Sequence, residues 1–156
     1  MPATKRSRQN TFKTILWLGL VSGTLDAIAA ILLSLKVGPV VIFKFIASGF
    51  FGKPAFAGGA EMVIAGILFH YLIAYAFTWL FYVFYPFTYK LFKNKYAVAI
   101  IYGGFAWIIM NMIVMPFTKI GAHHIKPATI VTGVLALIIC VALPVVLVAD
   151  KKNRAS

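Results

Sequence analysis

The chain has 156 residues, of which 62% are hydrophobic and only 12% are charged. Soluble domains are about 45–50% apolar and about 25% charged, so this composition excludes an ordinary soluble domain and indicates a membrane protein. The formal net charge is +12, but the basic residues gather at the ends of hydrophobic segments, where they set membrane topology, so we expect no nucleic-acid partner.

The first predicted span covers residues 14–35 and follows a basic tail, residues 1–13. At about 1.5 Å per residue a helix of this length reaches roughly 33 Å, enough to cross the bilayer core. The next apolar run, residues 40–51, is about a dozen residues long and therefore too short to span. We expect a short interfacial or re-entrant helix there, and the pattern leaves both alternatives open.

Three further spans are predicted at residues 60–85, 96–117 and 128–149, before a basic tail at 150–156. The predicted fold is thus an all-α, four-transmembrane-helix bundle that forms one domain over residues 14–149. The two tails and the loop 86–95 carry ten of the 15 lysines and arginines. This charge bias favours both termini in the cytoplasm.

Ionisable or polar side chains within a span are costly in hydrocarbon, and three of them are candidate site residues. Counted at about 1.5 Å per residue, Asp26, His70 and Asn111 all lie in the central or outer-central bilayer. A buried Asp26–His70 pair with Asn111 nearby would satisfy groups that cannot remain bare in lipid. Two interpretations stay open: a hydrogen-bonded clamp between helices, or a proton-responsive site.

The surroundings of Asp26 indicate which way its side chain faces. On a helix, Gly19, Ser22, Gly23 and Asp26 share one face. Gly19 and Gly23 also form a G-x-x-x-G motif, which lets a second helix approach closely. We therefore expect the carboxylate to face other helices and not lipid.

Two further groups of residues are candidate sites. Glu61 should lie near the outer interface, where Lys44 or Lys53 would form an ordinary ion pair with it, or a gate. The His123–His124 loop contains no Cys, Asp or Glu to complete a metal site. No second intramembrane histidine faces His70 to clamp a haem, so we expect neither metal nor cofactor.

Known catalytic motifs are absent from the sequence. We find no nucleotide-binding loop, no G-x-S-x-G and no H-E-x-x-H, so we expect no enzyme activity. Pro144 cannot donate a backbone hydrogen bond and leaves the carbonyl of Cys140 without its helical donor, which predicts a kink in the fourth span.

A set of short motifs lies in order along residues 17–149. They are G-T-L-D (23–26), A-S-G-F-F-G (47–52), F-A-G-G (56–59), G-I-L-F-H (66–70), Y-G-G (102–104), M-N-x-x-V-x-P (110–116) and L-P-V (143–145). This order resembles a group of small bacterial inner-membrane proteins, broadly of the YagU type, with four predicted spans and no assigned function. The resemblance implies a bacterial inner membrane and brings no catalytic residues.

The sequence supports three classes of function. The first is a small integral inner-membrane protein with a structural, assembly or stress-related role. The second is a proton-linked small-solute transporter or channel that uses Asp26 and His70, and the third is a cofactor-binding membrane subunit. The lipid bilayer is the expected partner, and a homo-oligomer or a partner membrane subunit is left open.

Overall fold

The computed structural model describes residues 3–119 and 127–153, and every regular element within them is helical. Four helical segments are long and apolar enough to cross a membrane: Thr11–Leu33, Ala60–Phe92, Lys95–Phe117 and Pro127–Lys152. A shorter apolar helix, Pro39–Phe51, lies between the first two of them. The predicted all-α, four-transmembrane-helix bundle with a short helix between spans 1 and 2 is confirmed.

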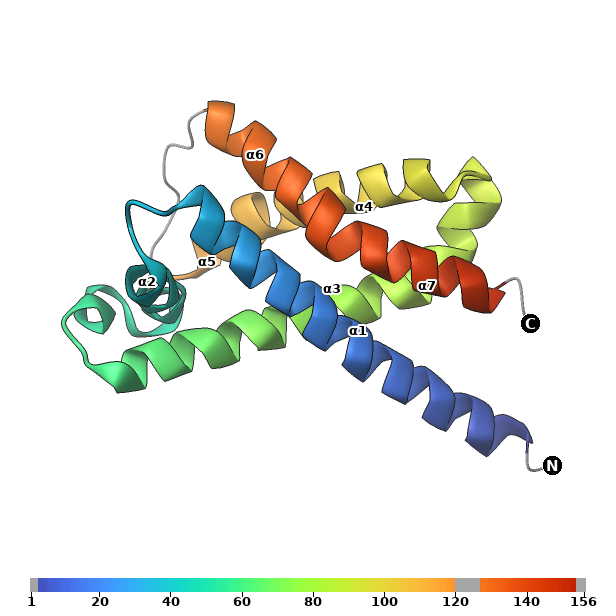
Figure 1. Ribbon diagram of the computed structural model, residues 1–156, viewed down its shortest axis with the longest axis horizontal. Coiled ribbons are helices and arrows are strands. Elements are labelled where there is room, and N and C mark those ends of the chain that lie inside the picture. The colour runs from blue at the N-terminus through green and yellow to red at the C-terminus, as the bar shows by residue number, and fades with distance from the viewer. Residues whose placement is uncertain (1–2, 120–126, 154–156) are drawn as a thin grey trace.

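The elements follow one another with short connections (Figure 1). The first half of the chain contains α1 (Ala3–Leu33), α2 (Pro39–Phe51), the 3-10 turn η1 (Lys53–Phe56) and α3 (Ala60–Phe92). The third span consists of α4 (Lys95–Ile108), the π-helical turn η2 (Ile109–Val114) and α5 (Met115–Phe117). The fourth consists of α6 (Pro127–Leu137), the π-helical turn η3 (Ile138–Ala142) and α7 (Leu143–Asn153).

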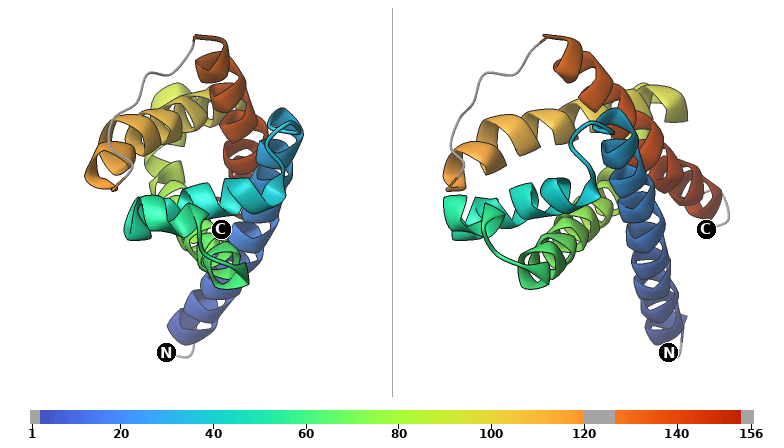
Figure 2. Two further views of the ribbon diagram at one scale, coloured as in Figure 1. Left: turned by 90° about the vertical axis from the view of Figure 1, so that its left-hand side faces the viewer. Right: turned by 60° about the vertical axis from the view of Figure 1, so that its left-hand side comes forward.

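The spans alternate in direction. The start of α1, the α3–α4 connection and the end of α7 lie at one end of the molecule, on the right in Figure 1, and α2 and η1 lie at the other. Helix α1 crosses α3 near the middle of both, and α2 lies beside the first half of α3 (Figures 1 and 2). The bundle therefore has two distinct ends, one of which carries the short helix.

Local sequence signals explain where several helices begin and end. Pro39 occupies the first turn of α2, where its missing N–H is not needed. Gly38 and Gly52 flank α2 with φ of 82° and 78°, a region open to glycine. Asn94 caps α4, because its Oδ1 accepts from the backbone N of Tyr96 at 2.9 Å.

Each π-helical turn lies just before a proline. η2 precedes Pro116, and η3 precedes Pro144. Proline has no N–H to bond the carbonyl four residues earlier, and a locally wider turn is a recognised way to accommodate that loss. At Pro144, where the sequence predicts a kink, the structure contains the π-helical turn η3.

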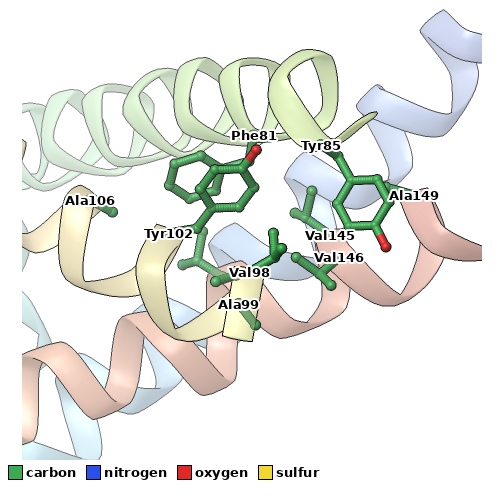
Figure 3. Packing of buried hydrophobic residues seen from close by; sticks show 11 residues of the cluster. Phe81, Tyr85, Val98, Ala99, Tyr102, Ala106, Val145, Val146 and Ala149 are labelled. Carbon is green, nitrogen blue, oxygen red and sulfur yellow. The ribbon is translucent and has the colours of Figure 1, made fainter. Parts of the chain in front are cut away.

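The main apolar core lies toward the end of the bundle that carries the chain termini (Figure 3). It is built from α3, α4, η3 and α7, and the ring of Phe81 stacks on the ring of Tyr102 at 4.6 Å between centroids. Elsewhere most large apolar side chains point outward, and at most 33% of the apolar window of any span is buried within the chain. Such an outer surface suits hydrocarbon, so the chain is a multi-pass membrane protein.

Two glycines allow helix backbones to touch. A Cβ at Gly66 of α3 would collide with the backbone carbonyl of Phe43 in α2. A Cβ at Gly103 of α4 would collide with the backbone and side chain of Ile138 in η3. Small residues at such contacts are the usual means of close packing between membrane helices. These contacts fix α2 and η3 around the centre of the bundle.

Candidate functional site

A cavity of about 100 Å³ lies where the helices meet, and it is lined by Asp26 of α1 and His70 of α3. The other lining residues are apolar and come from α2, α3, α4, η2, α6 and η3. A water molecule requires roughly 10–15 Å³ of such volume, so the cavity has room for a few waters and not for a large solute. The structure thus brings two of the candidate site residues to one small cavity.

His70 links α3 to α1 through a backbone carbonyl. Its side chain is buried, and Nε2 lies 2.8 Å from the carbonyl oxygen of Gly23. A carbonyl oxygen only accepts, so Nε2 carries the proton and donates it. The ring nitrogen that remains able to take up a proton is therefore Nδ1.

Asp26 is held differently. In the described part of the chain its carboxylate accepts no hydrogen bond and forms no ion pair within 4.0 Å. It interacts electrostatically with His70 on α3 and Cys140 on η3. The carboxylate therefore lines the cavity without a direct partner among the described residues, and the cavity has room for water that would hydrogen-bond it.

The polar contacts that hold α1 on α3 come from other residues. Ser22 Oγ donates to the carbonyl of Leu18, so Thr78 Oγ1 donates to Ser22 Oγ, 3.1 Å away. In the same way Thr24 Oγ1 lies 2.8 Å from Tyr71 Oη. Both contacts cross from α1 to α3, as does the His70 bond. A clamp between the helices exists, and Asp26 is not part of its bonding.

The hydrogen bond between Ser22 and Thr78 should give a measurable coupling free energy. Both side chains are fully buried, and hydrogen bonds between membrane helices average about 0.6 kcal/mol with a maximum of about 1.7. We expect the variants Ser22→Ala and Thr78→Val to couple by about 1 kcal/mol in a double-mutant cycle of unfolding in detergent. Thr132→Val, at an exposed site where Thr132 bonds only carbonyls of its own helix, is the control. Additive effects of the two substitutions would contradict the clamp.

Asn111 lies apart from this cavity. It is half-buried in η2, and its Nδ2 donates to the carbonyl of Trp107 in the same span at 3.0 Å. The neighbouring Met110 lines the cavity, and Asn111 does not. The structure therefore joins Asp26 with His70 and leaves Asn111 bonded to its own helix.

The charged residues near α2 are close to one another without a direct ion pair. Glu61 is exposed, and its Oε1 accepts from the backbone N of Gly59, the residue before α3, at 2.5 Å. Lys44 Nζ donates to the carbonyl of Phe56 at 3.3 Å and interacts with Glu61 over a longer distance. Lys53 is exposed in η1. Among the described residues, Glu61 forms no ion pair within 4.0 Å with either lysine.

The structure contains a second polar cluster, which was not predicted from the sequence. Helix α7 continues to Asn153, so Asp150, assigned from sequence to the tail, is buried at 5% exposure. Its Oδ1 accepts from Tyr85 Oη at 3.0 Å, and its Oδ2 lies 3.7 Å from Lys95 Nζ. The sequence does contain one indication of this cluster, because all three residues lie at the ends of predicted spans on the same side of the membrane.

Comparisons of the chain with protein-family models, with curated proteins and with solved structures found no match. The class of protein is therefore defined by the fold and the cavity: a small integral membrane protein with four apolar helices and an ionisable centre. Within residues 3–119 and 127–153, no three His, Cys, Asp or Glu side chains gather as a metal site would require. His123 and His124 lie outside the described residues.

Proposed function

We propose that this chain is a proton-linked transporter or channel of the bacterial inner membrane and that Asp26 and His70 form its proton-binding site. The observation that carries the proposal is the carboxylate of Asp26, which bonds to no described residue and shares a small cavity with the imidazole of His70. Ionisable residues inside a membrane protein usually mark an ion or proton pathway. A purely structural pair would bond directly, and these two residues do not.

The geometry suits a proton better than a larger substrate. The cavity holds a few waters, and a water between the two side chains would connect the carboxylate to Nδ1 of His70. Because Nε2 stays bonded to Gly23, a proton can be taken up at Nδ1 without releasing α3 from α1. Histidine is the side chain whose charge changes most readily near neutral pH. We therefore assign proton exchange, and not solute binding, to this cavity.

The proposed orientation places both termini in the cytoplasm. It is supported by the ten basic residues of the tails and the 86–95 loop, against five on the opposite side. The resemblance to four-span bacterial inner-membrane proteins supports the location. We propose no enzyme activity and no cofactor for this chain.

Infrared titration in liposomes tests the proton site without requiring a substrate. We expect a carboxyl band whose intensity changes with pH in the wild-type protein and is missing in Asp26→Asn. His70→Gln should move the midpoint of that band, because it removes the neighbouring group that can itself take up a proton. Glu61→Gln, which alters an exposed carboxylate outside the cavity, is the control and should leave the band unchanged. If no Asp26-dependent band titrates while the protein stays folded, the proton site is wrong.

Proton flux tests the activity itself. Vesicles containing the wild-type protein and a pH-sensitive dye should dissipate an imposed pH gradient faster than protein-free vesicles. Asp26→Asn should reduce the flux to the protein-free rate, whereas Ser22→Ala, which alters only the clamp, should retain flux in proportion to folded protein. Equal flux through wild type and Asp26→Asn would contradict a proton-linked pathway.

A structural or assembly role is the second candidate, and the clamp between α1 and α3 favours it. The Ser22–Thr78 and Thr24–Tyr71 contacts, together with the His70 bond, would hold the two helices whether or not protons move. Under this role Ser22→Ala lowers the yield or stability of the protein, and Asp26→Asn, which leaves the clamp intact, produces no defect in proton flux. The two experiments above therefore distinguish the candidates.

A further inference from the structure

A second space of about 260 Å³ adjoins the central cavity on the side of α2. It lies between α2, α3 and the end of the third span, and its lining includes Phe50, Phe69 and Thr118. Ile46 of α2 and Ile73 of α3 line both this outer space and the central cavity. The two side chains are therefore the shared wall between the outer space and Asp26.

Helices α2 and α5, which both contribute to the lining of the outer space, lie close together at the end of the bundle opposite the chain termini (Figures 1 and 2). Two of its other lining residues, Leu72 and Phe117, are 66% and 89% exposed. Next to this space, the backbone N of Lys119 donates to the carbonyl of Gly49, a lining residue, at 2.9 Å. Lys119 Nζ also lies 6.0 Å from the centre of the Phe50 ring. These contacts attach the end of the third span to α2 beside the outer space.

We propose that protons reach Asp26 and His70 from this outer space with water, and that Ile46 and Ile73 are the constriction that excludes larger species. This inference rests on the proposed function, because it takes the central cavity as the proton-binding site. Apolar constrictions of this kind gate by controlling whether water enters. The substrate class of the site is therefore the proton carried by water, and organic solutes are rejected at the constriction.

The contact between α2 and α3 sets the width of the constriction. Gly66 lets the Phe43 backbone touch α3. Ile46 follows Phe43 by three residues and Ile73 follows Gly66 by seven, so each isoleucine lies on the same helix face as that contact. A small movement of α2 on α3 would therefore change the gap between Ile46 and Ile73.

An alternative route from the lipid side has weaker support. The groove between α3 and α4, about 370 Å³ and lined by residues such as Phe84 and Phe105, is larger and apolar. It has no lining residue in common with the central cavity. By contrast, the outer space shares two, and we therefore place the route there.

Silver-ion access to an introduced thiol tests the route in detergent-solubilised full-length protein. The reporter is Met110→Cys in a Cys140→Ser background, because Met110 lines the central cavity and cysteine is smaller. The readout is the rate at which Ag⁺ protects this thiol from later alkylation, followed by mass spectrometry. We expect Ile46→Ala and Ile73→Ala to speed the reaction about tenfold, a barrier lowered by about 1.4 kcal/mol. Ile46→Phe should slow it.

Leu137→Ala is the matched control, since Leu137 lines the central cavity but not the outer space, and it should leave the rate unchanged. Equal acceleration by Ile46→Ala and Leu137→Ala, or no effect of either isoleucine, would overturn the route. If an alanine variant fails to fold, Ile46→Val and the slowing by Ile46→Phe decide the question. Silver access does not depend on protonation of Asp26, so failure of the route and failure of the proton site are separate results.

Discussion

Replacing Gly103 with alanine should lower the free energy of unfolding by about 2 kcal/mol, because the added methyl group has no space. A Cβ at this position would collide with the backbone as well as the side chain of Ile138 in η3. A side chain can change rotamer, but a backbone can move only if the fourth span moves with it. The methyl group would therefore push α4 and η3 apart and loosen the core around Tyr102.

The adjacent Gly104 provides the matched control. A Cβ there meets nothing within 4 Å, and alanine is favoured over glycine within a helix by about 0.8–1.0 kcal/mol. Gly104→Ala should thus leave stability unchanged or raise it, although the chemical change is identical. Unfolding of both variants in mixed detergent micelles checks the contrast. Equal stability of the two would show that η3 does not pack on α4 at Gly103.

Removing the carboxylate of Asp150 should destabilise the protein by about 1–3 kcal/mol, because Tyr85 Oη loses a buried acceptor and Lys95 loses its counter-ion. The side chain of Asp150 is 7% exposed and that of Lys95 is 30% exposed. Because water can reach Lys95, the loss of stability should be smaller than the roughly 3–5 kcal/mol expected when one partner of a fully buried ion pair is removed. We expect Asp150→Ala to loosen the packing of α7 on α3 and α4.

The neighbouring residue is again the control. Lys151 is exposed, so Lys151→Ala should change the unfolding free energy by less than about 0.5 kcal/mol. Tyr85→Phe removes one hydrogen bond, and combined with Asp150→Ala it should add little, because both act on the same contact. A normal unfolding curve for Asp150→Ala would place that carboxylate in water, as a tail residue would be.

The number and order of the spans could be predicted from the sequence because bilayer thickness sets them. Runs of apolar residues near 20 in length span, and the dozen residues that form most of α2 cannot. The end of the fourth span was harder to predict. Asp150 follows a hydrophobic run and precedes two lysines, which is the usual pattern of a helix leaving the membrane. Its burial depends on Tyr85 and Lys95, which come from two other spans.

The site was partly predictable for a related reason. Counting residues gives depth in the membrane, and depth places Asp26 and His70 at similar levels. Depth does not give the rotation of a helix about its own axis, which decides what a side chain contacts. For this reason the bond from His70 to the Gly23 carbonyl, and that from Asn111 to its own helix, could not be predicted. Both depend on how α1, α3 and η2 are turned.

The fourth span has a repeat of four residues along its inward face. In its second half the fully buried residues form the pairs 141–142, 145–146 and 149–150. An α-helix has 3.6 residues per turn, so such a stripe drifts by about 40° at each repeat. The wider turn η3 ends at the first of these pairs and so sets the rotation with which the stripe meets α3 and α4. The fold thus depends on the number of residues within η3 as well as on their types. Deleting one residue there would rotate the rest of the fourth span about its axis. Asp150 would then face lipid, although no side chain had been substituted.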